Sequence, residues 1–184
     1  ELVRPRVGAG ARCGPGREEA RKALVVVIFR LGRAGTSAAM AAAVKRGVAV
    51  RALIAHTNRG GEKSLRKLEM RLLQAGVTIS RTADDLVRYH GKMMIVDGPE
   101  RHIHGFNYTR LDIEQSRSFG IVTRDKKVVR EAVQLFEADA LRQNYTPTHP
   151  RLVVSPENSR AVLTAFLKGA RKELLIYDAQ LRDN

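Results

Sequence analysis

Residues 89–97 read Tyr-His-Gly-Lys-Met-Met-Ile-Val-Asp, and Gly105-Phe106-Asn107 follows a short distance along the chain. The first stretch belongs to an apolar run, Val87–Val96, that predicts a strand. Asp97-Gly98-Pro99-Glu100 is a strong turn signal, and Arg101–Phe106 predicts the returning strand. This hairpin decides the fold. It adds two antiparallel strands to the alternating strands and helices that come before it in the sequence.

Strands and helices alternate around this hairpin, and glycines follow several of the helical segments. We expect further strands over Ala23–Phe29, Val48–Ile54, Val77–Ser80 and Phe119–Thr123, and helices over Ser37–Lys45, Lys63–Ala75 and Lys127–Leu141. The pattern predicts an α/β fold with a mixed β-sheet flanked by helices on both faces. Residues 5–18 are rich in Gly and Arg, so we expect an irregular segment there and assign no role to Cys13.

An internal repeat with an offset of 150 residues predicts two lobes. It aligns Leu2-Val3 with Leu152-Val153 and Ala20-Arg21-Lys22 with Ala170-Arg171-Lys172. We therefore expect residues 1–150 to form a first lobe that ends in the linker Asn144–Pro150. Residues 151–184 would open a second lobe as strand, helix and strand, the last over Leu174–Tyr177. The alternative is chance similarity between two basic, Ala-rich segments.

The chain of 184 residues has 33 Lys and Arg against 19 Asp and Glu, a formal net charge of +14. This surplus predicts an anionic partner, either nucleic acid, acidic lipid headgroups or a phosphate-bearing substrate. A genome biased toward Arg and Ala would give the same surplus. A single cysteine excludes an internal disulfide framework and a multi-cysteine zinc site. No apolar run approaches the length of about 18 residues that a membrane span needs.

His90 and Lys92 carry the most informative chemistry. Side chains alternate along a strand, so these two share a face, and Gly91 between them allows close approach. An ammonium beside an imidazole suits a phosphate, since lysine donates to phosphate oxygens and its charge favours the neutral, nucleophilic imidazole. Asn107 can bring an amide donor to the same oxygens. His102 and His104 share a strand face, but two ligands are too few, so we expect no metal and no cofactor.

The spacing His90-x-Lys92, four residues and Asp97, followed by Gly105-x-Asn107, resembles the signature of the phospholipase D superfamily. One departure is His104, which stands where many members have a first glycine. The resemblance extends to Ala43–Arg51 and to the run from Asn58 through Leu73. These two blocks are similar to the bacterial branch of cardiolipin synthase-like and phosphatidylserine synthase-like proteins.

The resemblance implies two similar lobes that each contribute one motif to a shared site. One histidine attacks phosphorus and forms a phosphohistidine, while the other protonates the leaving alcohol, with no metal required. His90, Lys92 and Asp97 are the catalytic motif residues, and His90 is either nucleophile or general acid. Lys92, Asn107 and Gly105 would bind the phosphate. For Asp97, whose strand parity differs from that of Lys92, we expect a structural task at the turn.

The expected function is metal-independent phosphodiester hydrolysis or phosphatidyl transfer on phospholipids. The alternatives are a nuclease of the same superfamily and a non-catalytic phosphate-binding half-site. Ser118 favours the last of these, since many members have a carboxylate near that point. A second lobe or a homodimer is needed to complete the site. We expect a cytoplasmic protein, with peripheral contact to the inner membrane as an alternative. The basic residues between Lys63 and Arg71 are expected to form a helix face exposed to solvent.

Overall fold

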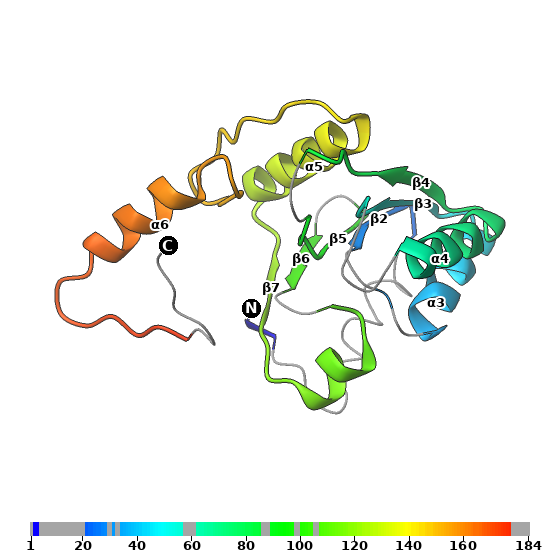
Figure 1. Ribbon diagram of the computed structural model, residues 1–184, viewed down its shortest axis with the longest axis horizontal. Coiled ribbons are helices and arrows are strands. Elements are labelled where there is room, and N and C mark those ends of the chain that lie inside the picture. Colours follow the sequence, from blue (N-terminus) through cyan, green and yellow to red (C-terminus); the bar gives the residue numbers. More distant parts are fainter. Residues whose placement is uncertain are drawn as a thin grey trace. The chain divides into compact units, whose positions relative to one another are not determined.

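A computed structural model describes residues 2–3, 21–28, 31, 34–56, 62–85, 89–97, 100–104 and 107–177 (Figure 1). The chain divides into two compact units, Glu1–Tyr145 and Thr146–Asn184. The irregular segment expected at residues 5–18 lies outside the described residues, as does Gly105.

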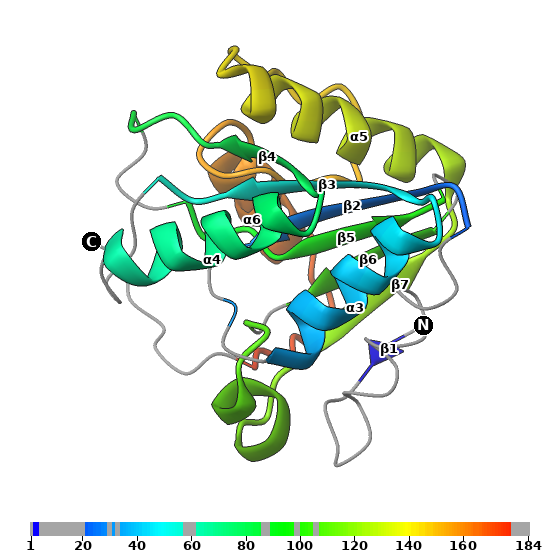
Figure 2. The ribbon, with the colours of Figure 1, turned by 90° about the vertical axis from the view of Figure 1, so that its right-hand side faces the viewer.

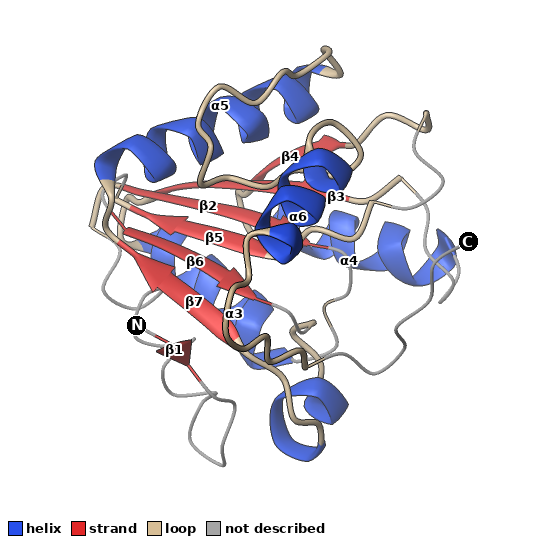
Figure 3. Cartoon of the chain, turned by 90° about the vertical axis from the view of Figure 1, so that its left-hand side faces the viewer, coloured by secondary structure: helices blue, strands red, loops and turns tan. Residues whose placement is uncertain are grey.

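The described part of the first unit holds a seven-stranded sheet with the order β1-β7-β6-β5-β2-β3-β4 (Figure 3). The strands are β1 (Leu2–Val3), β2 (Ala23–Ile28), β3 (Ala49–Ile54), β4 (Thr78–Arg81), β5 (Met93–Val96), β6 (Glu100–His104) and β7 (Gly120–Thr123). β2, β3 and β4 are parallel to one another. β5 is antiparallel to β2, and β6, β7 and β1 continue the antiparallel half. The hairpin of β5 and β6 therefore extends the parallel half from its β2 side.

Helices cover both faces of this sheet. They are α3 (Ala34–Lys45), α4 (Glu62–Gln74) and α5 (Lys126–Leu141), with a short π-helix, η1, at Leu111–Gln115. α3 and α4 lie on one face and α5 lies on the opposite face (Figure 2). The predicted fold class, a mixed sheet with helices on both faces, is confirmed.

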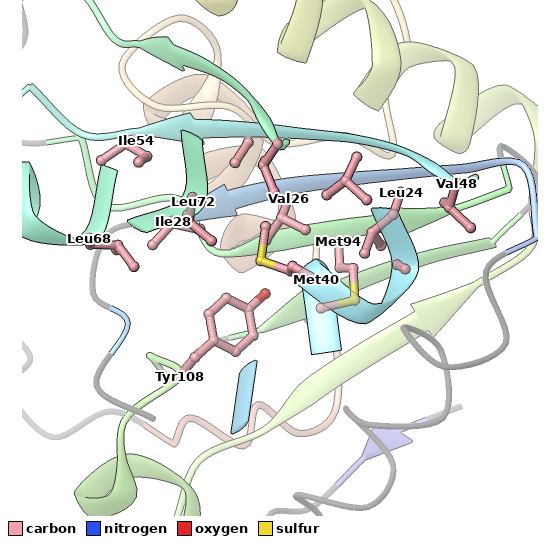
Figure 4. Packing of buried hydrophobic residues seen from close by; sticks show 14 of the residues in the cluster. Leu24, Val26, Ile28, Met40, Val48, Ile54, Leu68, Leu72, Met94 and Tyr108 are labelled. Atoms are coloured by element: carbon pink, nitrogen blue, oxygen red, sulfur yellow. The ribbon is translucent and has the colours of Figure 1, made fainter. Parts of the chain in front are cut away.

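The continuous apolar sequence of β2 follows from burial on both faces. Leu24, Val26 and Ile28 belong to a cluster that includes residues of α3 and α4 and also the fully buried Tyr108 (Figure 4). Val27, one residue out of phase, belongs to a second cluster with residues of α5. Alternate side chains of β2 thus pack into two different hydrophobic clusters, one on each face of the sheet.

The ends of the helices match their local sequences. α3 is followed by Gly47, whose φ of 83° is a backbone conformation that glycine adopts without steric cost. α5 begins after Asp125, whose carboxylate accepts hydrogen bonds from the N–H groups of Lys127 and Val128. α4 buries Leu65, Leu68 and Leu72, the apolar positions that predicted it.

The strand predicted over Val87–Val96 is wrong in length, because β5 begins only at Met93. Its register pairs Met93 with Val27 on one side and with Ile103 on the other, and the ladder ends there. The residues before it include Gly91, which has low strand propensity. His90 and Lys92 therefore lie in the segment that leads into the strand and are not part of the ladder.

The second unit contains α6 (Ser159–Lys168), which matches the helix expected there. Asn158 holds the turn before it by accepting from Val154 N at 2.7 Å and donating to the Leu152 carbonyl at 3.1 Å. The strands expected around Leu152 and over Leu174–Tyr177 are wrong, since neither segment is a strand in the described part. A strand needs a neighbouring strand to receive its backbone hydrogen bonds.

Candidate active site

The sheet topology brings the residues of the predicted motif to one end of the β5–β6 hairpin. His90 and Lys92 lie just before β5, and Asn107 lies just after β6. Because the two strands are antiparallel, the start of one and the end of the other meet at the same edge. The carboxyl end of β2 reaches this edge too, since Val27 pairs with Met93. Leu31 forms a bridge there with Tyr108.

His90 and Lys92 contact each other directly. The Lys92 Nζ lies 2.7 Å from the His90 Nε2. A protonated lysine has only donors, so this contact fits the imidazole tautomer that accepts at Nε2 and carries its proton on Nδ1. In that tautomer the Nε2 atom that faces Lys92 has a lone pair, which a nucleophile needs.

Lys92 is 5% exposed, whereas His90 is exposed. Burying an ammonium is costly unless it is hydrogen-bonded or paired with a negative group. The His90 Nε2 supplies a neutral acceptor, and a phosphate oxygen would be a stronger, charged one. The two side chains are thus placed so that both could contact one phosphate group.

Asn107 is held by Asp112, a residue that the sequence did not single out. Its backbone N and its side-chain Nδ2 both donate to Asp112 Oδ2, at 3.1 and 2.7 Å. The side-chain Oδ1 of Asn107 is buried and has no hydrogen-bond partner among the described residues. The next residue, Tyr108, is fully buried and fixes the backbone at this point.

Asp97 lies at the other end of β5, about 16 Å from Lys92 along a strand that rises about 3.3 Å per residue. Its carboxylate accepts hydrogen bonds from three consecutive backbone N–H groups, those of Arg21, Lys22 and Ala23, at 2.8 to 3.1 Å. Burial raises the pKa of Asp97, but these N–H groups and the charge of Lys22 lower it, and the pKa falls below its usual value overall. The carboxylate thus ties the end of β5 to the entry of β2.

The structure brings together three of the five predicted site residues, His90 and Lys92 by direct contact and Asn107 by its place at the same edge. It places Asp97 apart from them, and Gly105 lies outside the described residues. No sequence signal identified Asp112, because its contact with Asn107 is made by a side chain that reaches back five residues.

No group of three or more His, Cys, Asp or Glu side chains that could hold a metal ion occurs among the described residues. In the same part of the chain, no helix has the length and apolar character needed to cross a membrane.

Comparison with known proteins identifies relatives. A family model described as "Cardiolipin synthase, PLD-like domain" matches residues 18–140. No curated protein sequence matches the chain. The fold is similar to that of Nuc from Salmonella typhimurium, a phospholipase D family member, with a TM-score of 0.70 at 16% identity over 80% of this chain and 97% of that chain.

Two further solved structures share the fold. Polyphosphate kinase from Porphyromonas gingivalis has a TM-score of 0.71 at 15% identity over 91% of this chain and 30% of that chain. NucT from Helicobacter pylori has a TM-score of 0.58 at 15% identity, with 76% of this chain and 93% of that chain covered. At such identities these likenesses establish the fold, and the family match rests on the sequence of the first unit.

Proposed function

The chain belongs to the phospholipase D superfamily, a group of phosphodiesterases, and we propose that it cleaves or transfers phospholipid phosphodiesters through a phosphohistidine on His90. The observation that supports this most directly is the 2.7 Å contact between Lys92 Nζ and His90 Nε2. It leaves the lone pair of Nε2 available once a phosphate oxygen takes over the ammonium.

In the proposed reaction Lys92 and Asn107 donate hydrogen bonds to the non-bridging oxygens of the phosphate. His90 Nε2 attacks phosphorus, the P–N bond forms, and the bond from phosphorus to the leaving alkoxide oxygen breaks. A second histidine gives its proton to the leaving alkoxide. Water or an acceptor alcohol then returns a proton to that histidine, attacks phosphorus and releases His90. The oxygens gain negative charge in each step, so fixed donors lower both barriers.

The proposed reaction needs a second histidine, and this need determines which partner we propose. The motif occurs once in the chain, so the site requires either a second lobe or a second copy of the chain that contributes its own His90. We propose that residues 151–184, in which α6 forms without the expected strands, belong to such a second lobe. In a homodimer, one His90 would act as nucleophile and the other as general acid.

A phospholipid substrate is supported by the family model, whose description names cardiolipin synthase. It would require peripheral contact with a membrane. The charge of +14 favours nucleic acid as a second candidate, because a phosphate backbone binds best to a cationic surface. Cleavage of nucleic acid would fall steeply with added salt, as counterion release predicts.

The test measures three substrates in EDTA with the whole chain: bis-p-nitrophenyl phosphate, vesicles of phosphatidylglycerol, and single-stranded DNA. We expect turnover of the first two where two copies of the chain associate, its loss in His90→Ala, and an acid-labile phosphoryl adduct on His90 by mass spectrometry. His149→Gln is the matched control, since it removes a histidine of the second unit.

Turnover that survives His90→Ala, or that depends on added metal, would disprove the phosphohistidine mechanism. Cleavage of DNA without cleavage of vesicles would instead assign the second candidate substrate. Activity that rises with the square of the protein concentration at low concentration would indicate that two copies complete the site.

A further inference from the structure

Asp112 contacts Asn107 at the edge of the site, and the proposed reaction gives Asp112 no role. Its Oδ2 accepts from the backbone N of Asn107 at 3.1 Å and from the side-chain Nδ2 at 2.7 Å. One carboxylate oxygen therefore fixes both the backbone and the side chain of the same residue.

Asp112 is itself held in place. Its backbone N donates to the Thr109 Oγ1 at 3.2 Å, and it lies in the first turn of η1. Ile113, the next residue, is 4% exposed, whereas Leu111 before it is 61% exposed. Asp112 is thus held through its backbone by the Thr109 hydroxyl and by the buried Ile113 beside it, as a group must be if it is to orient another.

The chemistry of the amide explains why such a group would be needed. An asparagine amide presents two donors at Nδ2 and an acceptor at Oδ1, and it can rotate to exchange them. A phosphate oxygen in a phosphodiester only accepts, so the side chain is productive in one orientation and repulsive in the other. A carboxylate also only accepts, and a reversed amide would place Oδ1 against Asp112 Oδ2. Asp112 therefore selects the orientation that a phosphate requires.

We infer that Asp112 is a positioning residue that orients the Asn107 amide so that its second Nδ2 hydrogen donates to the substrate phosphate. The buried Oδ1 of Asn107, without a hydrogen-bond partner among the described residues, fits this role, because the acceptor end of the amide is kept away from the anion. The consequence for catalysis rests on the proposed function. The orientation of the amide can be measured without it.

The experiment combines a double-mutant cycle with a spectroscopic signature. The variants are Asp112→Ala, Asn107→Ala and the pair together, with Asp112→Asn as the conservative change. Glu114→Gln is the matched control, because it neutralises another carboxylate of η1 whose partner, Arg110, is exposed. Turnover of bis-p-nitrophenyl phosphate is measured in EDTA, together with the ¹⁵N–¹H resonances of the Asn107 side-chain amide, assigned from their loss in Asn107→Ala.

We expect Asp112→Ala to lower kcat/KM by about 10-fold to 100-fold, the range of a hydrogen bond to a charged group. In the Asn107→Ala background the same change should alter kcat/KM by less than about twofold, because the residue on which it acts is gone. The amide resonances should shift in Asp112→Ala and stay in place in Glu114→Gln. Asp112→Asn, which can still accept through its own Oδ1, should retain part of the rate.

Equal losses in both backgrounds would show that Asp112 acts independently of Asn107 and would overturn the inference. Unchanged amide resonances in Asp112→Ala would overturn it as well. If the wild-type chain turns over no phosphodiester, the proposed function fails. Titration with inorganic phosphate then decides the inference: the Asn107 amide should respond in the wild type and lose that response in Asp112→Ala.

Discussion

Replacing Asp97 by Asn tests how strongly the end of β5 is tied to the entry of β2. Asp97 has a φ of 51°, and Asn tolerates this left-handed conformation about as well, so the change adds little backbone strain. Asn keeps one oxygen for the N–H groups of Lys22 and Ala23. It loses the negative charge, and it turns an amide donor toward the N–H of Arg21.

The magnitude follows from the three backbone donors. A hydrogen bond to a charged group contributes about 1.5–3 kcal/mol, against about 0.5–1.5 kcal/mol for a neutral one. The difference is about 1 kcal/mol for each bond. Arg21 and Lys22 are exposed, so water replaces part of what they lose. We therefore expect Asp97→Asn to lower the free energy of unfolding by about 1–2 kcal/mol at neutral pH.

The pH dependence identifies the charge as the cause. Folding lowers the pKa of Asp97, so its contribution is complete above the unfolded value of about 3.9 and is lost as the pH falls through the lower, folded value. The difference in stability between wild type and Asp97→Asn should thus be constant from about pH 7 to about pH 5 and should shrink in acid.

Urea unfolding followed by circular dichroism, repeated across this range, measures the difference. Asp85→Asn is the control, because Asp85 is an exposed carboxylate outside the sheet. A difference below about 0.3 kcal/mol at pH 7 would refute the calculation from the three donors. A difference that persists unchanged in acid would refute the role of the charge.

Two further changes test the packing. Phe136→Ala should lower the free energy of unfolding by about 3–5 kcal/mol in urea, because the ring is 1% exposed and supports the Arg51 guanidinium 4.9 Å from its centroid; a loss below about 1 kcal/mol would show that this core collapses to fill the space. Gly76→Ala should lower the melting temperature, since its φ is 82° and a Cβ would lie 3.0 Å from Val44 Cγ1, at a cost of about 1–2 kcal/mol. Gly35→Ala is its control, with open space around the new methyl group and a place inside α3 where Ala is favoured, so it should leave the melting temperature unchanged or raise it.

Much of the fold could be predicted from the sequence because its elements carry strong periodic signals. The leucines of α4 repeat at helical spacing, and β2 is apolar throughout. The family resemblance and the fold class are both confirmed. Each of these features lies within one short segment, so it can be recognised without knowing which segments pack against each other.

What could not be predicted depends on neighbours in space. The apolar composition of Val87–Val96 gives no sign of where the ladder with β2 and β6 ends. The expected strand at Leu174–Tyr177 has the right composition and lacks a pairing strand among the described residues. The side chain of Asp112 reaches back to Asn107, five residues earlier, a contact that depends on how the backbone between them turns.

The central position of β2 has a consequence for synthesis on the ribosome. Leu24 pairs with Val50 on one side and with Val96 on the other. The parallel partner β3 emerges soon after β2, whereas β5 emerges only after α4 and β4 have been made. During that interval one edge of a valine-rich strand has no partner, and such an edge can recruit another nascent chain. The yield of native protein should therefore depend on how quickly translation delivers residues 93–96.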